Sequence, residues 1–345
     1  MKSEKDFSEP VVVGITAGDA AGIGPEIIIK SLPHLLTAAE SQFVIYCRKN
    51  VFDEAYSLFN GNFQYDIFTG NEDDLPKGSR IIVADFLKYK NLKIEYGKVS
   101  TELADDAMKY VEIATRDALT GKIDTIVTAP INKLGVHAAG YKERGHTEFI
   151  TGIAGIYDYA MMFVGGGLKV VLLTIHVAIR DVPSKITKHA VSKKIELTAN
   201  ALIKWFAIKN PRIAVCGLNP HSGEGGIIGD EDKNEILPAV EEAVKKGISV
   251  SGPLPADTVF NRCKNGEFDA VIAMYHDQGL VPVKALSFGK GVNVTIGMPF
   301  IRTSPDHGTA YDIAGKGIAD AGSMIESVKL AIELTKNNRV AGKSN

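Results

Sequence analysis

The sequence lacks several features that would assign it to common classes of protein. No apolar run approaches the roughly 20 residues that a helix needs to cross a bilayer, which disfavours an integral membrane protein. The charged start, residues 1–10, contains no apolar segment of the kind found in secretory signals, so we expect a flexible N-terminal tail and a cytoplasmic protein. The formal net charge of -2 gives no bulk electrostatic reason to expect binding to nucleic acid or to an anionic membrane.

Cysteine is scarce, and one widespread nucleotide-binding motif is absent. The only cysteines are Cys47, Cys216 and Cys263, without paired or CxxC spacing. We therefore expect buried free thiols in a reducing compartment. No GxxxxGK[ST] segment occurs, which disfavours a P-loop nucleotidase.

Short runs rich in Val and Ile alternate along the chain with helical patterns. This alternation predicts an α/β protein with a largely parallel sheet, and 345 residues predict about two domains at roughly 150 residues each. Residues Ser100–Leu119 form the clearest amphipathic pattern. Met161–Val164 and Val170–Ile175 resemble a strand pair across a glycine turn. We expect the last helix at Ile318–Leu334, followed by a polar tail, Lys336–Asn345.

Three strand-like runs each end close to a histidine, namely His176, His221 and His276. Ligand sites of parallel α/β folds lie beyond the carboxyl ends of strands, so these histidines are candidates for one shared site. Neutral imidazoles bind zinc and other divalent transition metals, and three of them leave a position open for substrate. Their spacing is too wide for a local motif, and the alternative is that each one only caps a strand end.

Other polar residues are candidates for binding an anion. Lys284, Asn293 and Arg302 could hold a phosphate or carboxylate, although solvated surface charge is the alternative for each. The pair His146–Thr147 stands at an expected helix start, where backbone N–H groups favour anions. Asp257 follows a proline-rich segment and could be a helix cap and no more.

A glycine-rich stretch follows His221. Its glycines are Gly223, Gly225, Gly226 and Gly229, which read GxGGxxG, a spacing similar to that of a dinucleotide fingerprint. Glycines without Cβ atoms suit an anionic ligand such as a dinucleotide, but a loop separates this stretch from the preceding strand. A lone match of this kind is weak, and a tight turn without ligand is the alternative.

Several long segments together resemble one family. They read GDAAGIGPEI, TAPINK, GHTEF, HVAIRDVP, LNPHSGEGG, GPLPADT, MYHDQGLVPVK and GVNVTIGMPFIRTSPDHGTA. They resemble the 4-hydroxythreonine-4-phosphate dehydrogenase family of vitamin B6 synthesis, and the match runs from about Val12 to Leu334. The segment Pro130–Lys133 is similar to a sister branch that oxidises 4-phospho-D-threonate or 4-phospho-D-erythronate in sugar-acid catabolism.

The resemblance implies a two-domain fold like that of isocitrate and isopropylmalate dehydrogenases, with the active site in the cleft between the domains. The expected domains are residues 1–140 with 310–345, and residues 141–309, the second carrying the dimer interface and most of the metal and substrate residues. The resemblance also implies a cytoplasmic homodimer whose active sites are shared at the interface. Each site would hold one divalent metal (Zn, Mg, Co or Mn) and NAD, with NADP as an alternative.

The resemblance also assigns roles to residues and a reaction. The implied metal ligands are His176, His221 and His276, and the implied substrate ligands are His146, Thr147, Lys284, Asn293 and Arg302. The expected reaction is oxidation of the C3 hydroxyl of 4-phosphooxy-L-threonine, followed by decarboxylation to 3-amino-2-oxopropyl phosphate. Asp257 or a group near Lys284 would act as the base. The other classes considered are a three-histidine zinc hydrolase and a phosphate-ligand acyltransferase.

Overall fold

The computed structural model describes residues 9–38, 40–69, 75–76, 78–87, 92–143 and 145–343, and the predicted N-terminal tail falls mostly outside them. The chain divides into two compact units. The first runs to Tyr157 and resumes at Met298–Arg339, and the second is Asp158–Gly297 with the chain end from Val340. The expected boundaries near 140 and 310 therefore differ from those of the structure, which groups residues 141–157 and 298–309 with the first unit.

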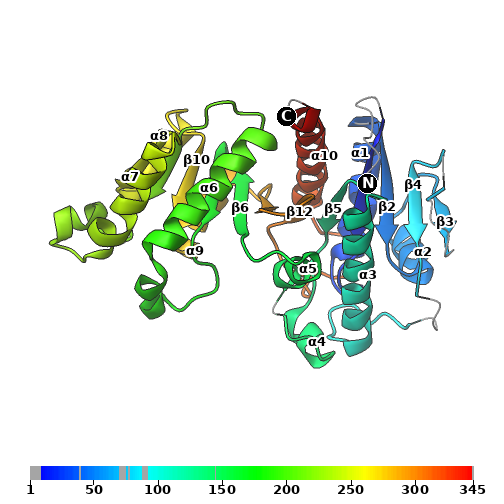
Figure 1. Ribbon diagram of the computed structural model, residues 1–345. Coiled ribbons are helices and arrows are strands. Elements are labelled where there is room, and N and C mark those ends of the chain that lie inside the picture. The colour runs from blue at the N-terminus through cyan, green and yellow to red at the C-terminus, as the bar shows by residue number, and fades with distance from the viewer. Residues whose placement is uncertain are drawn as a thin grey trace. The chain divides into compact units, whose positions relative to one another are not determined.

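The sheet of the first unit is parallel, with the strand order β3-β4-β2-β1-β5-β12 (Figure 1). Its strands are β1 (Val11–Thr16), β2 (Ser41–Tyr46), β3 (Asp66–Phe68), β4 (Ile81–Ala84), β5 (Thr125–Thr128) and β12 (Ile301–Pro305). Strands β4, β5 and β12 are buried at every residue, as expected for a parallel sheet covered on both faces. No strand is predicted at β3, because its three residues, beginning with Asp66, carry no periodic pattern.

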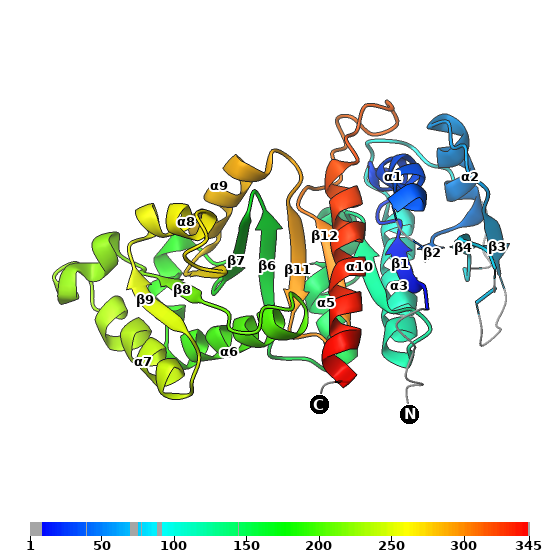
Figure 2. The ribbon, with the colours of Figure 1, turned by 90° about the horizontal axis from the view of Figure 1, so that it is seen from above.

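Helices cover both faces of this sheet. They are α1 (Gly24–Ala38), α2 (Lys49–Leu58), α3 (Thr101–Thr120), α4 (Lys133–Ala138), α5 (His146–Ala154) and α10 (Gly322–Lys343). Helix α3 lies on one side of β1, and α1 lies on the other (Figure 2). The Ser100 side chain caps α3 by accepting a hydrogen bond from the backbone N–H of Leu103, and Gly121 ends the helix with φ 84°. Helix α5 packs against α3, which explains why residues 146–154 belong to the first unit.

The predicted polar tail from Lys336 is wrong, because α10 continues to Lys343. Arg339 explains part of this extension. Its guanidinium forms a salt bridge with Asp124 at 2.9 Å and donates to the carbonyl oxygen of Glu9 at 2.8 Å. These contacts join residues far apart in sequence, so no local pattern around Arg339 predicts them.

The second unit has a mixed sheet in the order β11-β6-β7-β10-β8-β9. Its strands are β6 (Ala160–Gly165), β7 (Leu168–Leu172), β8 (Ile213–Cys216), β9 (Val250–Leu254), β10 (Ala270–Ala273) and β11 (Val292–Ile296). Strands β6 and β7 form the predicted antiparallel pair, joined by a turn with positive φ at Gly166 and Gly167. Strands β7, β10, β8 and β9 run parallel, so their carboxyl ends lie along the same edge.

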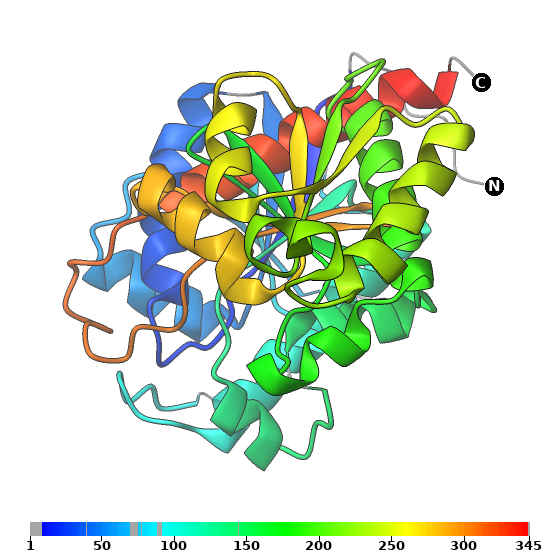
Figure 3. The ribbon, with the colours of Figure 1, turned by 90° about the vertical axis from the view of Figure 1, so that its left-hand side faces the viewer.

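Helices also lie on both sides of this second sheet, with α8 and α9 on one side and α6 and α7 on the other (Figure 3). They are α6 (Lys188–Lys204), α7 (Leu237–Lys245), α8 (Ala256–Lys264) and α9 (His276–Ser287). A π-helical turn, Asp232–Ile236, directly precedes α7. Single π turns of this kind occur often at functional sites.

Two predictions from composition can be compared with the structure. Cys47, Cys216 and Cys263 are free and buried, as expected. Across the part of the chain that the structure describes, no helix combines the length and apolar character needed to cross a membrane.

Candidate active site

The three histidines predicted to bind metal follow neighbouring parallel strands of the second unit. His176 follows β7, His221 follows β8, and His276 is the first residue of α9, the helix that follows β10. Because β10 pairs with both β7 and β8, the three carboxyl ends are adjacent. The ring centroids of His176 and His276 are 6.0 Å apart and tilted by 35°. The structure therefore brings the three segments to one edge and two of the imidazole rings close together.

His221 points to a different partner. It lies in the 3-10 segment Pro220–Gly226, is exposed, and its Nδ1 atom is 2.8 Å from Glu224 Oε1. The hydrogen bond and charge of Glu224 raise the pKa of His221, and the carboxylate of Asp257 adds to this effect. Among the residues described, no three His, Cys, Asp or Glu side chains are arranged so as to hold a metal ion.

The donor set nevertheless fits a divalent metal in its chemistry. Zinc–nitrogen bonds of about 2.0–2.1 Å place two imidazoles on one ion with ring centres about 5–6.5 Å apart, and the 6.0 Å separation of His176 and His276 falls in this range. His221 is exposed and its Nδ1 atom faces Glu224, which leaves Nε2 as the nitrogen that could bind a metal. His176, His221 and His276 are the residues that would hold the metal.

The other predicted residues of the second unit differ in exposure. Lys284, in α9, and Asp257, in the first turn of α8, are both exposed. Asn293, in β11, is half-buried, and its Oδ1 atom is buried without a hydrogen-bond partner among the described residues. A buried acceptor without a partner is costly, so Asn293 is a candidate for contact with a bound molecule.

The glycine-rich stretch adopts an unusual backbone. Five consecutive residues, His221 to Gly225, have left-handed φ and ψ angles. A Cβ atom at Gly229 would lie 2.6 Å from the Asn219 side chain, whereas nothing lies within 4 Å of one at Gly225. The left-handed turn and the close approach explain why glycine occurs at 223, 225 and 229 without invoking a cofactor. The predicted NAD contacts of Gly223, Gly225, Gly226 and Gly229 remain predictions.

The first unit holds the remaining predicted residues in a compact polar cluster. His146 and Thr147 open helix α5, and Arg302 lies in β12. The Arg302 guanidinium donates to Thr128 Oγ1 at 2.6 Å and, more weakly, to Thr147 Oγ1 at 3.4 Å. Arg302 is only 3% exposed, and the His146 Nε2 atom is buried without a partner in the described part of the chain. Cationic and neutral donors at a helix N-terminus together favour an anionic ligand.

Burial controls the protonation of this cluster. It lowers the pKa of His146 well below its usual 6.5, and the positive charge of Arg302 lowers it further. Burial also lowers the pKa of Arg302 to about 10, although the carboxylate of Glu148 opposes this change. At neutral pH the cluster therefore contains a neutral imidazole beside a cationic guanidinium.

Sequence reasoning assigned no role to three residues that shape these clusters. Thr128, at the end of β5, accepts the shorter of the two Arg302 hydrogen bonds described above. In the second unit, Asp232 and Gln278 hold the segments that carry the histidines. The position of Thr128 at the carboxyl end of a predicted strand was an available signal, whereas the other two act on backbone groups that only the folded chain brings near.

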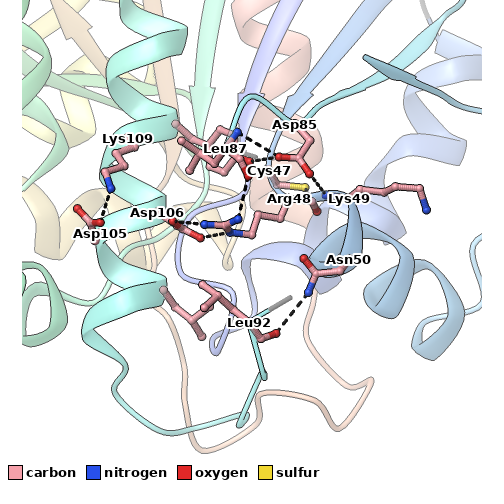
Figure 4. Close-up of polar contacts among 12 residues, drawn as sticks. Cys47, Arg48, Lys49, Asn50, Asp85, Leu87, Leu92, Asp105, Asp106 and Lys109 are labelled. Carbon is pink, nitrogen blue, oxygen red and sulfur yellow. Dashed lines mark hydrogen bonds and ion pairs between the residues drawn. The ribbon is translucent and has the colours of Figure 1, made fainter. Parts of the chain in front are cut away.

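A second charged cluster in the first unit is internally paired (Figure 4). Arg48 makes a two-point contact with the carboxylate of Asp106 and donates to the carbonyl oxygen of Leu87 at 2.9 Å. The neighbouring Asp85 accepts from the backbone N–H of Lys49 at 3.0 Å. The adjoining cavity measures about 20 Å³, which is room for about one water molecule. The cluster therefore connects elements of the fold and does not provide a ligand site.

Comparisons with known proteins identify the family. The family model described as pyridoxal phosphate biosynthetic protein PdxA matches residues 39–331. The chain is 42% identical to a 4-hydroxythreonine-4-phosphate dehydrogenase of Sulfurihydrogenibium, over 94% of this chain and 99% of that protein. It is also 42% identical to a D-threonate 4-phosphate dehydrogenase of Cupriavidus necator, over 94% of this chain and 97% of the relative.

A solved structure agrees with this assignment. The crystal structure of a 4-hydroxythreonine-4-phosphate dehydrogenase from Klebsiella pneumoniae matches with a TM-score of 0.84 and 37% identity, over 96% of this chain and 100% of that one. The expected α/β fold class and enzyme class, a dehydrogenase, are thereby confirmed. The hydrolase and acyltransferase alternatives are set aside. Because of these sequence matches and its fold, the chain belongs to the family of pyridoxal phosphate biosynthetic protein PdxA.

Proposed function

We propose that the protein oxidises the C3 hydroxyl of 4-phosphooxy-L-threonine with NAD and a divalent metal, and that the resulting 3-oxo acid loses CO₂. The products are 3-amino-2-oxopropyl phosphate, CO₂ and NADH, because the decarboxylation takes up the proton that the oxidation releases. The observation that carries this proposal is the placement of three histidines at the adjacent carboxyl ends of β7, β8 and β10. Membership of the family and the printed activities of the relatives support it.

The residues of the first unit are proposed to bind the phosphate of the substrate. Arg302 is a buried cation with planar donors, which suits phosphate oxygens. Thr147 and the neutral His146 add donors at the start of α5. Burial strengthens these interactions because little water competes for the donors.

The residues of the second unit are proposed to hold the reacting end of the substrate. A metal on His176, His221 and His276 would supply Lewis-acid chemistry, lowering the pKa of the hydroxyl that is oxidised. Asp257 or a group close to Lys284 would take the hydroxyl proton, and NAD, when bound, would supply the oxidant that accepts the hydride. The buried Oδ1 of Asn293 accepts a hydrogen bond from the substrate.

A second candidate substrate is D-threonate 4-phosphate. The 42% identity to the Cupriavidus necator enzyme equals that to the Sulfurihydrogenibium enzyme, so identity alone favours neither. The segment Pro130–Lys133, which resembles the sugar-acid branch, favours this alternative. The reaction type is the same for both substrates.

We also propose that the protein acts as a homodimer with NAD as its preferred cofactor and NADP as the alternative. Light scattering coupled to size-exclusion chromatography measures the mass of the assembly. A particle of one 37.1 kDa chain at micromolar concentration would contradict the dimer.

The decisive experiment follows NAD reduction at 340 nm with 4-phosphooxy-L-threonine and, separately, D-threonate 4-phosphate. Each assay is run as purified, with chelator, and after the divalent metal is restored. We expect turnover of the first substrate, loss of activity with chelator and recovery with metal. Preference for the second substrate would support the sugar-acid alternative, and full activity in chelator would contradict the metal requirement.

A further inference from the structure

The three histidine-bearing segments of the second unit are joined by hydrogen bonds around one backbone unit, Met274. Met274 lies between the end of β10 and His276. Its carbonyl oxygen accepts from the Thr174 hydroxyl at 2.8 Å and from the Thr174 backbone N–H at 3.2 Å, two residues before His176. Two of the three strand ends are therefore tied to each other directly.

The third strand end is tied in by the side chain of Gln278. The Gln278 Oε1 atom accepts from the backbone N–H of Met274 at 2.6 Å, and its Nε2 atom donates to the carbonyl oxygen of Gly217 at 2.8 Å. Gly217 directly follows β8, four residues before His221. One amide thus bridges the two strand ends that lead to His221 and His276. Only one orientation of the amide satisfies both bonds, because one partner is a donor and the other an acceptor.

The chain is closely packed around this bridge, so Met274 and Gly217 have little room to move. Met274 and Gly217 are buried, so a backbone group that lost the bridge would lack a ready replacement in water. A Cβ atom at position 217 would lie 2.7 Å from Asp232 Oδ1 and 2.8 Å from the Ser222 Cα atom. The chain therefore passes so closely here that a shift of Gly217 would move the segment carrying His221.

We propose that Gln278 is a positioning residue that sets the separation between His221 and His276 for metal binding. This inference rests on the proposed function, because it requires that these histidines share a metal. Gln278 acts through the backbone of Met274 and Gly217, and it touches neither metal nor substrate. Outer residues that orient metal ligands typically contribute about 10–100-fold to metal affinity.

The test measures binding of Co²⁺, whose visible absorption reports ligand number and geometry. Gln278→Met keeps the side-chain length and removes both hydrogen bonds. We expect its Kd for Co²⁺ to rise about tenfold, with a changed visible spectrum. Gln278→Glu keeps the acceptor for Met274 and loses the donor to Gly217, so it should also weaken Co²⁺ binding. Weaker binding in this variant would show that the hydrogen bond to Gly217, which leads to His221, carries the effect.

A matched control comes from the first unit. Gln42 is also half-buried and donates to backbone carbonyl oxygens, those of Pro76 at 3.1 Å and Ser79 at 2.8 Å. Gln42→Met should leave the Kd and spectrum of Co²⁺ unchanged, which separates the proposed role from a general loss of stability. Thermal unfolding confirms that each variant is folded.

The possible outcomes separate the inference from the proposed function. Folded Gln278 variants that bind Co²⁺ within twofold of the wild type, with the wild-type spectrum, would overturn the inference alone. A wild-type protein that binds no Co²⁺ would overturn both the metal site and the inference. If Gln278→Met does not fold, the result with Gln278→Glu decides.

Discussion

At the scale of single residues, the candidate ligands Arg302 and His146 of the first unit are more buried than Lys284 and Asp257 of the second unit. Arg302 is 3% exposed and the His146 Nε2 atom is buried, whereas Lys284 and Asp257 lie in solvent. Buried donors have fixed positions and little competition from water, so they are suited to recognition of one group. The exposed residues are free to move with a bound substrate.

A first prediction concerns the shape of the Arg302 guanidinium. Arg302→Lys retains the positive charge but loses the planar donors that reach Thr128 and Thr147. Loss of a hydrogen bond to a charged group costs about 1.5–3 kcal/mol, so kcat/KM for the phosphorylated substrate should fall about 10- to 100-fold. Steady-state kinetics measures the change. Arg339→Lys, at a paired arginine, is the control, and equal kinetic losses in the two variants would contradict phosphate binding by Arg302.

A second prediction concerns pH and His146. Because its folded pKa lies below the usual 6.5, the unfolded chain takes up the proton first as the pH falls. His146 therefore lowers the free energy of unfolding as the pH drops from about 6.5 toward the folded pKa, by at most about 1.4 kcal/mol per pH unit. Urea unfolding measured at several pH values should show that the free energy of unfolding falls less between pH 7 and 5.5 in His146→Gln than in the wild type. The exposed His137→Gln is the control, and equal slopes in all three proteins would contradict the assignment.

At the scale of elements, the π-helical turn before α7 fixes the segment that leads to His221. The buried carboxylate of Asp232 accepts from the backbone N–H groups of Leu218 at 2.8 Å and Asn219 at 3.0 Å, and from the Asn219 side chain at 2.9 Å. The non-glycine left-handed residues that follow are individually unfavourable, by about 1–2 kcal/mol each. Asp232 provides hydrogen bonds that help to offset this strain.

A third prediction follows for Asp232. Asp232→Asn replaces one acceptor by a donor that faces other donors, and it removes the negative charge. We expect the free energy of unfolding to fall by about 1–3 kcal/mol, measured by urea titration. The exposed Asp230→Asn should change it by less than about 0.5 kcal/mol. Similar values for the two variants would show that Asp232 does not hold the segment.

At the scale of the whole molecule, each unit has its own set of strands and its own buried interior. The core of the second unit includes Val170, Leu172, Val271 and Val283, which line the strands and helix around the histidines. Smaller apolar clusters of the first unit surround Leu103 and Met108 in α3. A ligand bound by one unit should therefore stabilise that unit most.

A fourth prediction uses this division. If a divalent metal binds His176, His221 and His276, saturation at about 100 times the Kd should stabilise the binding state by about 2.7 kcal/mol. Hydrogen exchange followed by mass spectrometry should show added protection concentrated in residues 158–297. A His276→Ala variant is the control, because it should lose the effect. Added protection from exchange that is confined to residues 9–157 would show that the metal binds in the first unit and not at the three histidines.

Much of the second unit was predictable because its signals are local. Val- and Ile-rich runs predicted the strands, Gly166 and Gly167 predicted the turn between β6 and β7, and histidines at strand ends predicted the edge where they meet. The extension of α10 was not predicted, since it depends on the pairing of Arg339 with the distant Asp124. Strand β3 was missed because it depends on pairing with β4.

By itself, the sequence determined the α/β class, the family and the residue types available for chemistry, since these depend on local periodicity and on long matching segments. Tertiary structure decided which of those residues are brought together. The Arg302 contact with Thr128 joins residues 174 positions apart, and the Gln278 contact with Gly217 joins residues 61 positions apart. Hydrogen bonds across such separations form only when the packed strands bring their ends to a common edge, and no local sequence pattern encodes that distance.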